Sequence, residues 1–265
     1  MSYRHSARHV FINGKFRHIK GWRPAPKDHR DLLLAIPSQE ELSKLPTSAD
    51  NSNLCSPVED QGELGSCTAN SSTSAMEALA KKLGIPVVEL SRLFVYYYSR
   101  KVEGTPPTED SGAVIRDVMK VLAHYGAPPE SLWPYDISQF STNPTYPVVQ
   151  AAQANRVTRY YKAPNLHAMK LAIAEGYTLV GGFSVPENMM SQECARTGLV
   201  KPPGPGERMV GGHAVHFVGY NDGSAVLRFQ NSWGAGWGDK GFGYLPYYFV
   251  DQGLADDFWS LRQET

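Results

Sequence analysis

The sequence predicts an α+β protein of two lobes, in which a helical lobe precedes a β-rich lobe and an extended N-terminal arm precedes both. Apolar residues recur at helical spacing in the first half of the chain, whereas β-rich runs separated by turn residues dominate the second half. Residues 1–45 show neither the helical spacing nor the β-rich runs. We therefore divide the 265 residues into an arm at 1–45, a helical lobe at 46–150 and a β-rich lobe at 151–265.

The arm is basic and rich in proline. Residues 1–27 carry seven Lys or Arg and no acidic residue, although the whole chain balances at 26 basic and 26 acidic residues, so the body is mildly acidic. Prolines favour an extended arm, with one helical turn expected near residues 31–35. A solvated tail and a segment lying across the acidic body both remain open. No aromatic-interleaved basic module follows, so we expect no nucleic-acid partner.

The helical lobe contains three predicted helices. The first begins at Cys67 and ends at Gly84, the second covers residues 89–100, and the third begins after Asp110 or Ser111 and ends at Gly126. The helical period places two sets of residues on the inner faces of the first and third helices: Ala69, Ser72, Met76, Leu79 and Leu83, and Ile115, Val118, Met119 and Leu122. Residues 127–147 are proline-rich and irregular, and we expect them to connect the lobes.

The β-rich lobe begins with a short helix from Asn165 to Glu175, followed by a buried strand at 178–185. Two further strands, 213–220 and 224–230, flank the turn sequence Asn221-Asp222-Gly223, which is typical of a hairpin. Another strand region covers 237–248. With a cysteine on the first lobe and a histidine and an asparagine on the second, we expect a cleft between the lobes.

Cys67 is the candidate nucleophile. It follows two glycines and stands where a helix begins, so the helix dipole and a neighbouring imidazolium are expected to lower the pKa of its thiol and give a thiolate. A buried structural cysteine is the alternative. Gln61, on the same glycine-containing loop, carries an amide donor. Together with the backbone N–H of Cys67, this donor could stabilise a developing oxyanion.

His213 and Asn231 complete the candidate site, because cysteine, histidine and asparagine are what thiol-based acyl transfer requires. Asn231 closes the second strand of the hairpin, and its side-chain oxygen can accept from the His213 ring and orient it. Trp233 and Trp237 are expected to shield this hydrogen bond from water. His216, three residues along the strand, faces the other side and is expected to be structural. No histidine has a metal-ligand spacing, so we expect neither a metal nor a cofactor.

Four segments carry a resemblance to a known family: residues 56–62 (SPVEDQG), 65–67 (GSC), 212–215 (GHAV) and 231–238 (NSWGAGWG). Over residues 45–265 the chain resembles the papain-like cysteine peptidases, specifically the xylellain-like enzymes of their bacterial branch. Leu64 and Thr68 stand where that family usually has a cysteine and an aromatic residue. The left-lobe disulfide of the family therefore cannot form here.

The resemblance implies a helical left lobe with the cysteine and a β-barrel-like right lobe with the histidine and asparagine. It also implies hydrolysis of peptide bonds in peptide or protein substrates through a thioester acyl-enzyme. By the same match, Gln61 is the oxyanion donor and Gly112 pairs with the substrate backbone. A catalytically silent peptide-binding protein and a thiol acyltransferase are the alternatives. The family's helical prodomain is longer than the arm. Because the arm is basic, proline-rich and extended and the body is acidic, we expect residues 1–40 to lie across the body as a short regulatory pro-segment that partly covers the cleft.

The remaining expectations concern the substrate pocket and the state of the protein. Four residues are expected to line an apolar pocket for the residue preceding the one at the cleaved bond: Phe183, Ser184, Val185 and Gly211. Gly212, Trp233 and Trp237 are further candidate substrate contacts. We expect a soluble monomer without a signal peptide or membrane span, in a compartment that the sequence does not indicate. Cys55 and Cys194 are expected to be free thiols, a disulfide between them being the alternative.

Overall fold

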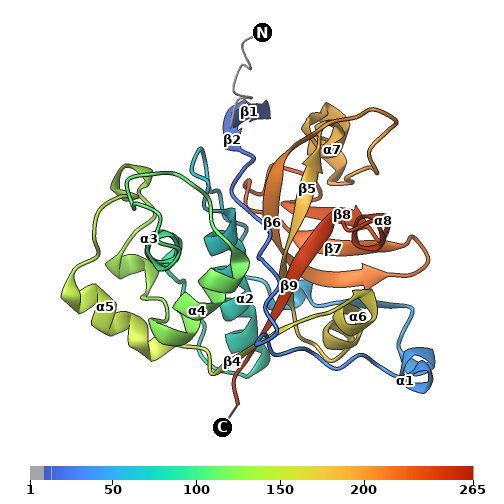
Figure 1. The fold of residues 1–265 in the computed structure, drawn as a ribbon, viewed down its shortest axis with the longest axis horizontal. Helices are drawn as coiled ribbons and strands as arrows, with labels where there is room; N and C mark the ends of the chain where they lie inside the picture. The colour runs from blue at the N-terminus through green and yellow to red at the C-terminus, as the bar shows by residue number, and fades with distance from the viewer. Residues whose placement is uncertain (1–8, 13, 265) are drawn as a thin grey trace.

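The computed structural model describes residues 9–12 and 14–264, so the first eight residues of the predicted arm lie outside the described residues. Figure 1 shows a helical lobe on one side, a sheet lobe on the other, and the start of the chain between them. The two-lobed α+β architecture predicted from the sequence is confirmed. Two apolar clusters form the core: one centres on the helices and also takes in Val180, Ala214 and Trp259 of the sheet, and the other lies within the sheet lobe.

The helical lobe is built from α2 (Cys67–Lys82), α3 (Arg92–Val102), α4 (Ile115–His124) and α5 (Tyr146–Ala152). The inner-face residues predicted for the third helix are all fully buried: Ile115, Val118, Met119 and Leu122. Short 3-10 turns follow at Glu130–Leu132, Ile137–Gln139 and Gln153–Asn155. The predicted connection at 127–147 is therefore irregular but belongs to this lobe, since buried Arg100 donates from Nη2 to the Phe140 carbonyl at 2.6 Å.

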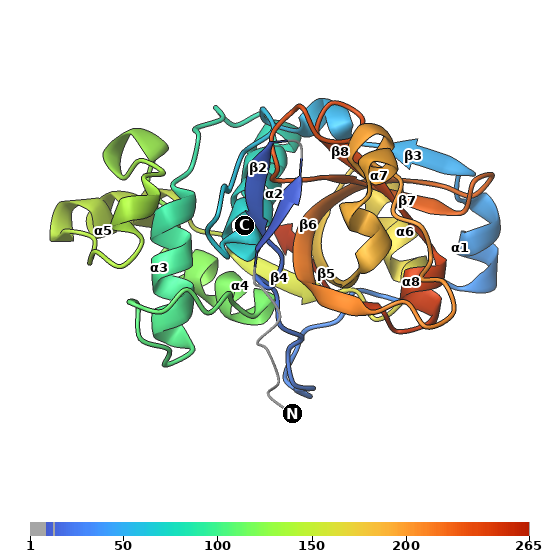
Figure 2. The same ribbon diagram turned by 90° about the horizontal axis from the view of Figure 1, so that it is seen from above.

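The sheet lobe holds a seven-stranded antiparallel sheet in the order β4-β9-β5-β6-β7-β8, with β3 pairing alongside β6. The strands are β3 (Ser48–Asp50), β4 (Arg159–Lys162), β5 (Leu179–Pro186), β6 (Met209–Asn221), β7 (Val226–Gln230), β8 (Phe242–Pro246) and β9 (Ala255–Arg262). Figure 2 shows the accompanying helices gathered on this lobe: α6 (Leu166–Ala174), α7 (Gln192–Thr197) and α8 (Tyr248–Asp251). Its remaining 3-10 turns are Ser52–Leu54 and Glu187–Met190.

Local signals account for several of these boundaries. The Asn165 side chain accepts from the Ala168 N–H at 3.0 Å and so caps α6, as the sequence predicts. Residues 222–225 form the turn between β6 and β7 at the predicted hairpin. β3 lies within the range assigned to the helical lobe, yet it pairs with the far end of β6. The boundary at residue 46 therefore divides the chain by sequence order rather than by packing.

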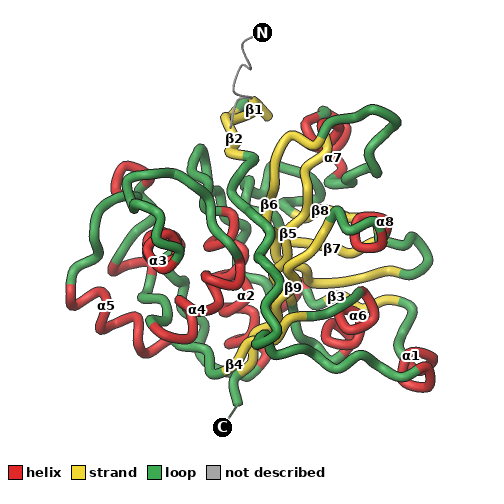
Figure 3. Tube along the Cα trace, in the orientation of Figure 1, coloured by secondary structure: helices red, strands yellow, loops and turns green. Residues whose placement is uncertain are grey.

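Residues 17–23 of the arm lie between the lobes. Its β1 (His9–Ile12) and β2 (Lys15–His18) form a hairpin, after which an extended chain descends between helices and strands (Figure 3). The helical turn expected near residues 31–35 is absent, because the Leu34 N–H donates to the Lys162 carbonyl and the Lys162 N–H to the Leu32 carbonyl. The backbone there extends the sheet edge instead. The arm's helix is α1 (Gln39–Lys44), which begins at a Ser38 capping box.

Candidate active site

Cys67 is the first residue of α2, at the face where the two lobes meet. Helix formation starts there because Asn70 donates its N–H to the Ser66 carbonyl at 3.0 Å. The preceding Gly65 N–H is held by the Asp110 carboxylate at 3.0 Å. The sulfur accepts from the Ala214 N–H of β6 at 3.4 Å. The thiol of the helical lobe thus touches the strand that carries the candidate histidine.

His213 precedes that contact by one residue, and its ring is held from two sides. Nε2 lies 2.8 Å from the Asn231 side-chain oxygen, and the Trp233 ring is stacked against the imidazole with centroids 4.8 Å apart. Trp237 packs edge-on against Trp233. All four side chains are at most 3% exposed. The two tryptophans therefore exclude water from the His213–Asn231 hydrogen bond, as the sequence predicts. His216 instead bonds Gln230, at 3.1 Å.

Gln61 is fully buried beside the nucleophile loop and is fixed at both ends of its amide. Its Nε2 donates to the Leu64 carbonyl at 2.9 Å, and its Oε1 accepts from the Ser232 hydroxyl at 2.6 Å. The Gln61 backbone N–H also donates to the Ser232 carbonyl. Sequence reasoning missed Ser232. The signal was its place directly after Asn231, where a buried hydroxyl could orient a neighbouring amide.

Burial sets the protonation of the thiol and the imidazole. It raises the pKa of the Cys67 thiol to about 12 and lowers the pKa of His213 to about 4. Both shifts run towards the neutral form of each group at pH 7. They favour the neutral thiol and imidazole in the covered form, against the thiolate–imidazolium pair expected from the helix terminus, because desolvation outweighs the backbone N–H groups that favour the thiolate.

The arm contributes to this burial. Gly21 packs directly on the nucleophile, such that a Cβ at this position would lie 2.5 Å from the Cys67 sulfur. The Trp22 N–H donates to the Gly212 carbonyl at 3.1 Å, and the Ala113 N–H donates to the Gly21 carbonyl at 2.9 Å. The arm thus adds a strand-like segment to both walls of the cleft. A solvated tail, the alternative left open by the sequence, is not what residues 18–23 form.

Two ion pairs and a histidine–carboxylate contact anchor the arm to the body. The Arg17 guanidinium pairs with Asp60 and donates to the Trp233 carbonyl at 2.9 Å. His18 lies 3.6 Å from the Asp110 carboxylate, and Arg23 pairs with Glu103. Burial raises the pKa of Glu103 to about 6. The expected attraction between a basic arm and an acidic body is therefore realised in specific pairs.

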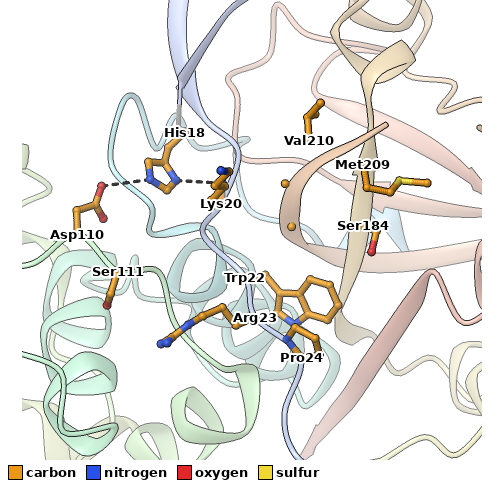
Figure 4. A pocket seen from close by; sticks show the side chains of 12 residues that line it. His18, Lys20, Trp22, Arg23, Pro24, Asp110, Ser111, Ser184, Met209 and Val210 are labelled. Atoms are coloured by element: carbon orange, nitrogen blue, oxygen red, sulfur yellow. Dashed lines mark hydrogen bonds and ion pairs between the residues drawn. The ribbon is translucent and has the colours of Figure 1, made fainter. Parts of the chain in front are cut away.

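A cavity of about 490 Å³ remains beside the arm. Figure 4 shows His18, Lys20 and Trp22 of the arm along it, with Ser111 on the helical wall and Met209 on the sheet wall. Ser184, Gly211 and Gly212, three of the candidate substrate contacts, line it too.

Phe183 and Val185 do not line this cavity, contrary to the sequence-based expectation. Both are fully buried in the core of the sheet lobe, where the Phe183 ring meets His213, Phe229 and Phe249. Successive strand residues face opposite sides, so only the even-numbered positions of β5 reach the cleft. Gly182 is the position that sequence reasoning missed.

The backbone N–H of Gly112, which was expected to pair with the substrate backbone, has a partner within the protein. Its N–H donates to the Tyr96 hydroxyl at 3.0 Å, and the neighbouring Ala113 pairs with the arm backbone. A hydroxyl from α3 therefore occupies the Gly112 donor, a contact that no local pattern reveals.

Residues 9–12 and 14–264 contain neither a disulfide nor a metal-binding cluster. Cys55, Cys67 and Cys194 are all free thiols. In this part of the chain no cluster of three His, Cys, Asp or Glu side chains could hold a metal ion. No described helix is both long enough and apolar enough to span a bilayer.

The fold and the Gln61–Cys67–His213–Asn231 arrangement define a class, and a family model described as papain family cysteine protease matches residues 45–249. The chain belongs to the papain family of cysteine proteases. Its mixed α+β fold resembles that of xylellain, a cysteine protease from Xylella fastidiosa, with a TM-score of 0.84 at 34% identity over 93% of this chain and 96% of that chain.

Two curated relatives show how far the similarity extends. The chain is 37% identical to an uncharacterized peptidase C1-like protein of Acanthamoeba polyphaga mimivirus, over 78% of this chain and 70% of that protein. It is 29% identical to cathepsin K of Gallus gallus, over 76% of this chain and 58% of that protein. The chain thus spans little more than half the length of the second relative.

Proposed function

We propose that this protein is a cysteine endopeptidase that hydrolyses peptide bonds through a thioester acyl-enzyme. The observation that carries the proposal is the hydrogen bond of 2.8 Å between His213 and Asn231, on the strand whose next amide touches the Cys67 sulfur. An oriented imidazole beside a thiol is what general-base activation of a nucleophile requires. The similarity to xylellain supports placing the chain in the bacterial branch of the family.

In the first step, Cys67 attacks the scissile carbonyl and its proton passes to His213. The resulting oxyanion accepts from the Cys67 N–H and from Gln61 Nε2, whose orientation Ser232 fixes. His213 then gives the proton to the leaving amine as the carbon–nitrogen bond breaks. In the second step, His213 takes a proton from water and the hydroxide adds to the thioester. The carbon–sulfur bond then breaks, and His213 returns the proton to the Cys67 sulfur as the acid product forms.

We further propose that the arm holds the enzyme in a covered form and that substrate competes with residues 18–23. Support comes from Gly21 over the thiol, from the backbone bonds to Gly212 and Ala113, and from the raised pKa of the buried thiol. Turnover then requires the arm to lift, after which water and substrate enter and the pKa of Cys67 can fall. The arm accordingly serves as a regulatory pro-segment.

The test uses the full chain, a peptidyl epoxide that reacts with nucleophilic thiols, and a mixture of peptides. We expect one covalent adduct on Cys67, none in Cys67→Ala, and cleaved peptides that end in free carboxylates. Cys194→Ala is the matched control, because Cys194 is also a buried free thiol and its loss leaves labelling intact. Labelling without cleavage would favour the silent peptide-binding protein. Products joined to an added amine in place of water would indicate an acyltransferase.

A further inference from the structure

The two candidate oxyanion donors lie at opposite ends of one loop. The Gln61 side chain is at its start, and the N–H of Cys67 is at its end, where α2 begins. Gly62 and Gly65 lie between them. Because glycine restricts the backbone less than any other residue, this loop does not by itself hold its ends at a fixed separation. Contacts across the loop and from outside it are therefore needed to place one donor relative to the other.

A chain of side-chain hydrogen bonds joins the two ends of this loop. Asn70, in the first turn of α2, donates from Nδ2 to the Ser66 hydroxyl at 3.0 Å. The Ser66 hydroxyl is hydrogen-bonded to the Tyr135 hydroxyl, which donates to the Gln61 carbonyl at 3.0 Å. With Ser66 as donor to Tyr135, each hydroxyl accepts one bond and donates one, so the chain is complete from the helix to the Gln61 backbone.

The serine in this chain gives up its usual local role. Ser66 stands at the N-cap position of α2, where a serine side chain commonly accepts from an N–H of the first helical turn. It makes no such bond here. Its buried hydroxyl is used by Tyr135 and Asn70 instead. A bond between distant segments thus takes the place of a helix cap, which indicates that this bond does more than stabilise α2.

The ring of Tyr135 is held by contacts that do not involve its hydroxyl. The Arg92 guanidinium lies over the ring, 4.4 Å from its centroid, and pairs with Glu59 and Glu130. The Tyr135 N–H donates to the Glu130 carboxylate at 2.5 Å. Burial raises the pKa of the phenol to about 12, so the hydroxyl keeps its proton at pH 7 and can donate it. Replacing Tyr135 by phenylalanine therefore removes the hydroxyl and keeps the ring in place.

We propose that Tyr135 is a positioning residue of the catalytic site, and that its hydroxyl fixes the spacing between the Gln61 donor and the Cys67 N–H. The inference rests on the proposed peptidase function. The hydroxyl acts on the backbone of Gln61 directly, and through Ser66 on the residue that precedes Cys67. Both donors must lie about 3 Å from the oxygen on which charge develops. A loss of spacing therefore weakens the transition state more than it weakens the bound substrate.

The test compares Tyr135→Phe with the unaltered chain, both at full length, on one peptide substrate. We expect kcat to fall about tenfold at unchanged KM, because oxyanion donors act in the transition state. Iodoacetamide is the second probe. Its reaction with the Cys67 sulfur displaces iodide and develops no oxyanion on a carbonyl carbon, so the labelling rate should stay within about twofold of that of the unaltered chain.

Tyr220→Phe is the matched control. The Tyr220 hydroxyl also donates to a backbone carbonyl, that of Pro46 at 2.7 Å, but this bond lies in the sheet lobe outside the candidate site. Its loss should leave kcat and KM unchanged. Ser66→Ala breaks the same chain at the neighbouring link. Ser66→Ala and Tyr135→Phe together should therefore lower kcat about tenfold, whereas independent sites would give about a hundredfold loss.

The outcomes separate this proposal from the function beneath it. An unchanged kcat in Tyr135→Phe, or a rise in KM alone, would overturn the positioning role while leaving the peptidase intact. An iodoacetamide rate that falls in parallel with kcat would also overturn it, because the hydroxyl would then act on the thiol. An equal loss of kcat in Tyr220→Phe would reduce the effect to general destabilisation.

Two further results remain decisive. If Tyr135→Phe does not fold, Ser66→Ala alone tests the chain, with the same expected fall in kcat at unchanged KM. An unaltered chain that cleaves no peptide would refute the proposed function and the positioning role with it.

Discussion

Arg17 is the arm residue whose loss should most clearly uncover the nucleophile. Its side chain is 5% exposed, pairs with Asp60 and donates to the Trp233 carbonyl. Replacing it by alanine removes two charge-assisted contacts between the arm and the body. It leaves Cys67, His213 and their hydrogen bonds untouched.

The free energy that the arm loses in Arg17→Ala depends on how deeply Arg17 and Asp60 are each buried. Hydrogen bonds to charged groups contribute roughly 1.5–3 kcal/mol each when buried. Asp60 is 32% exposed and can rehydrate, so much of that contribution is recovered when Arg17 leaves. We expect the arm to dock about 2 kcal/mol less tightly, which increases the fraction of uncovered molecules about 30-fold. Lys15 pairs with the same carboxylate but is 63% exposed, so Lys15→Ala should change that fraction less than about threefold.

The assay is the second-order rate at which an epoxide probe labels Cys67 in the full chain at pH 7. Arg17→Ala should label about 30-fold faster than the unaltered chain, and Lys15→Ala at nearly the unaltered rate. Cys194, 2% exposed, is an internal reporter, because its labelling would reveal global unfolding in place of arm release. If Arg17→Ala labels no faster than Lys15→Ala while Cys194 stays protected, the arm is not held as we describe.

Three further predictions concern the site and its pH dependence. Asn231→Ala frees the His213 ring and should lower kcat on a peptide substrate by about tenfold to a hundredfold; unchanged turnover would contradict the orienting role. Ser232→Ala removes the donor to Gln61 and should lower kcat about tenfold at unchanged KM, whereas a rise in KM alone would point to substrate binding. Burial lowers the pKa of His216 to about 4, so the folded state resists the proton that the unfolded ring takes up below pH 6.5, and stability is lost as pH falls from 6.5 towards 4. Urea unfolding measures the free energy of unfolding at pH 7 and at pH 5. The loss of this free energy between the two pH values should be about 2 kcal/mol smaller in His216→Gln than in the unaltered chain, and an equal loss in both would exclude this residue as a cause.

Local patterns predicted much of this structure. The face of α4 and the cap of α6 each depend on residues within one helix, and the hairpin after β6 depends on its turn residues. The four candidate catalytic residues lie within short motifs, and the structure brings them together; their chemical roles stay predictions. Sequence-based prediction succeeded where the deciding interaction lies within a few residues along the chain.

The errors share a cause of the opposite kind. Whether Gly182 or Phe183 faces the cleft depends on how β5 sits against the arm, which strand alternation alone leaves undetermined. The Gly112 N–H donates to the hydroxyl of a tyrosine on α3. Burial raises the pKa of the Cys67 thiol, and a segment 46 residues earlier in the chain contributes to that burial. Each outcome depends on contacts between distant segments, for which no local period exists.

The tether that follows the covering segment has a kinetic consequence. Beyond Arg23, the chain is fixed to the sheet lobe where the Ala25 N–H bonds Asp257 at 2.5 Å and where Leu34 pairs with Lys162. A lifted arm therefore remains within a few residues of the cleft, at an effective concentration on the order of millimolar. If substrate competes with the arm as we propose, diluting the protein does not dilute this competitor, and the uncovered fraction is a property of each molecule. The substrate concentration must then overcome the effective concentration of the tethered arm. Cutting the chain between Arg23 and Ala25 would release the arm and remove this competition permanently.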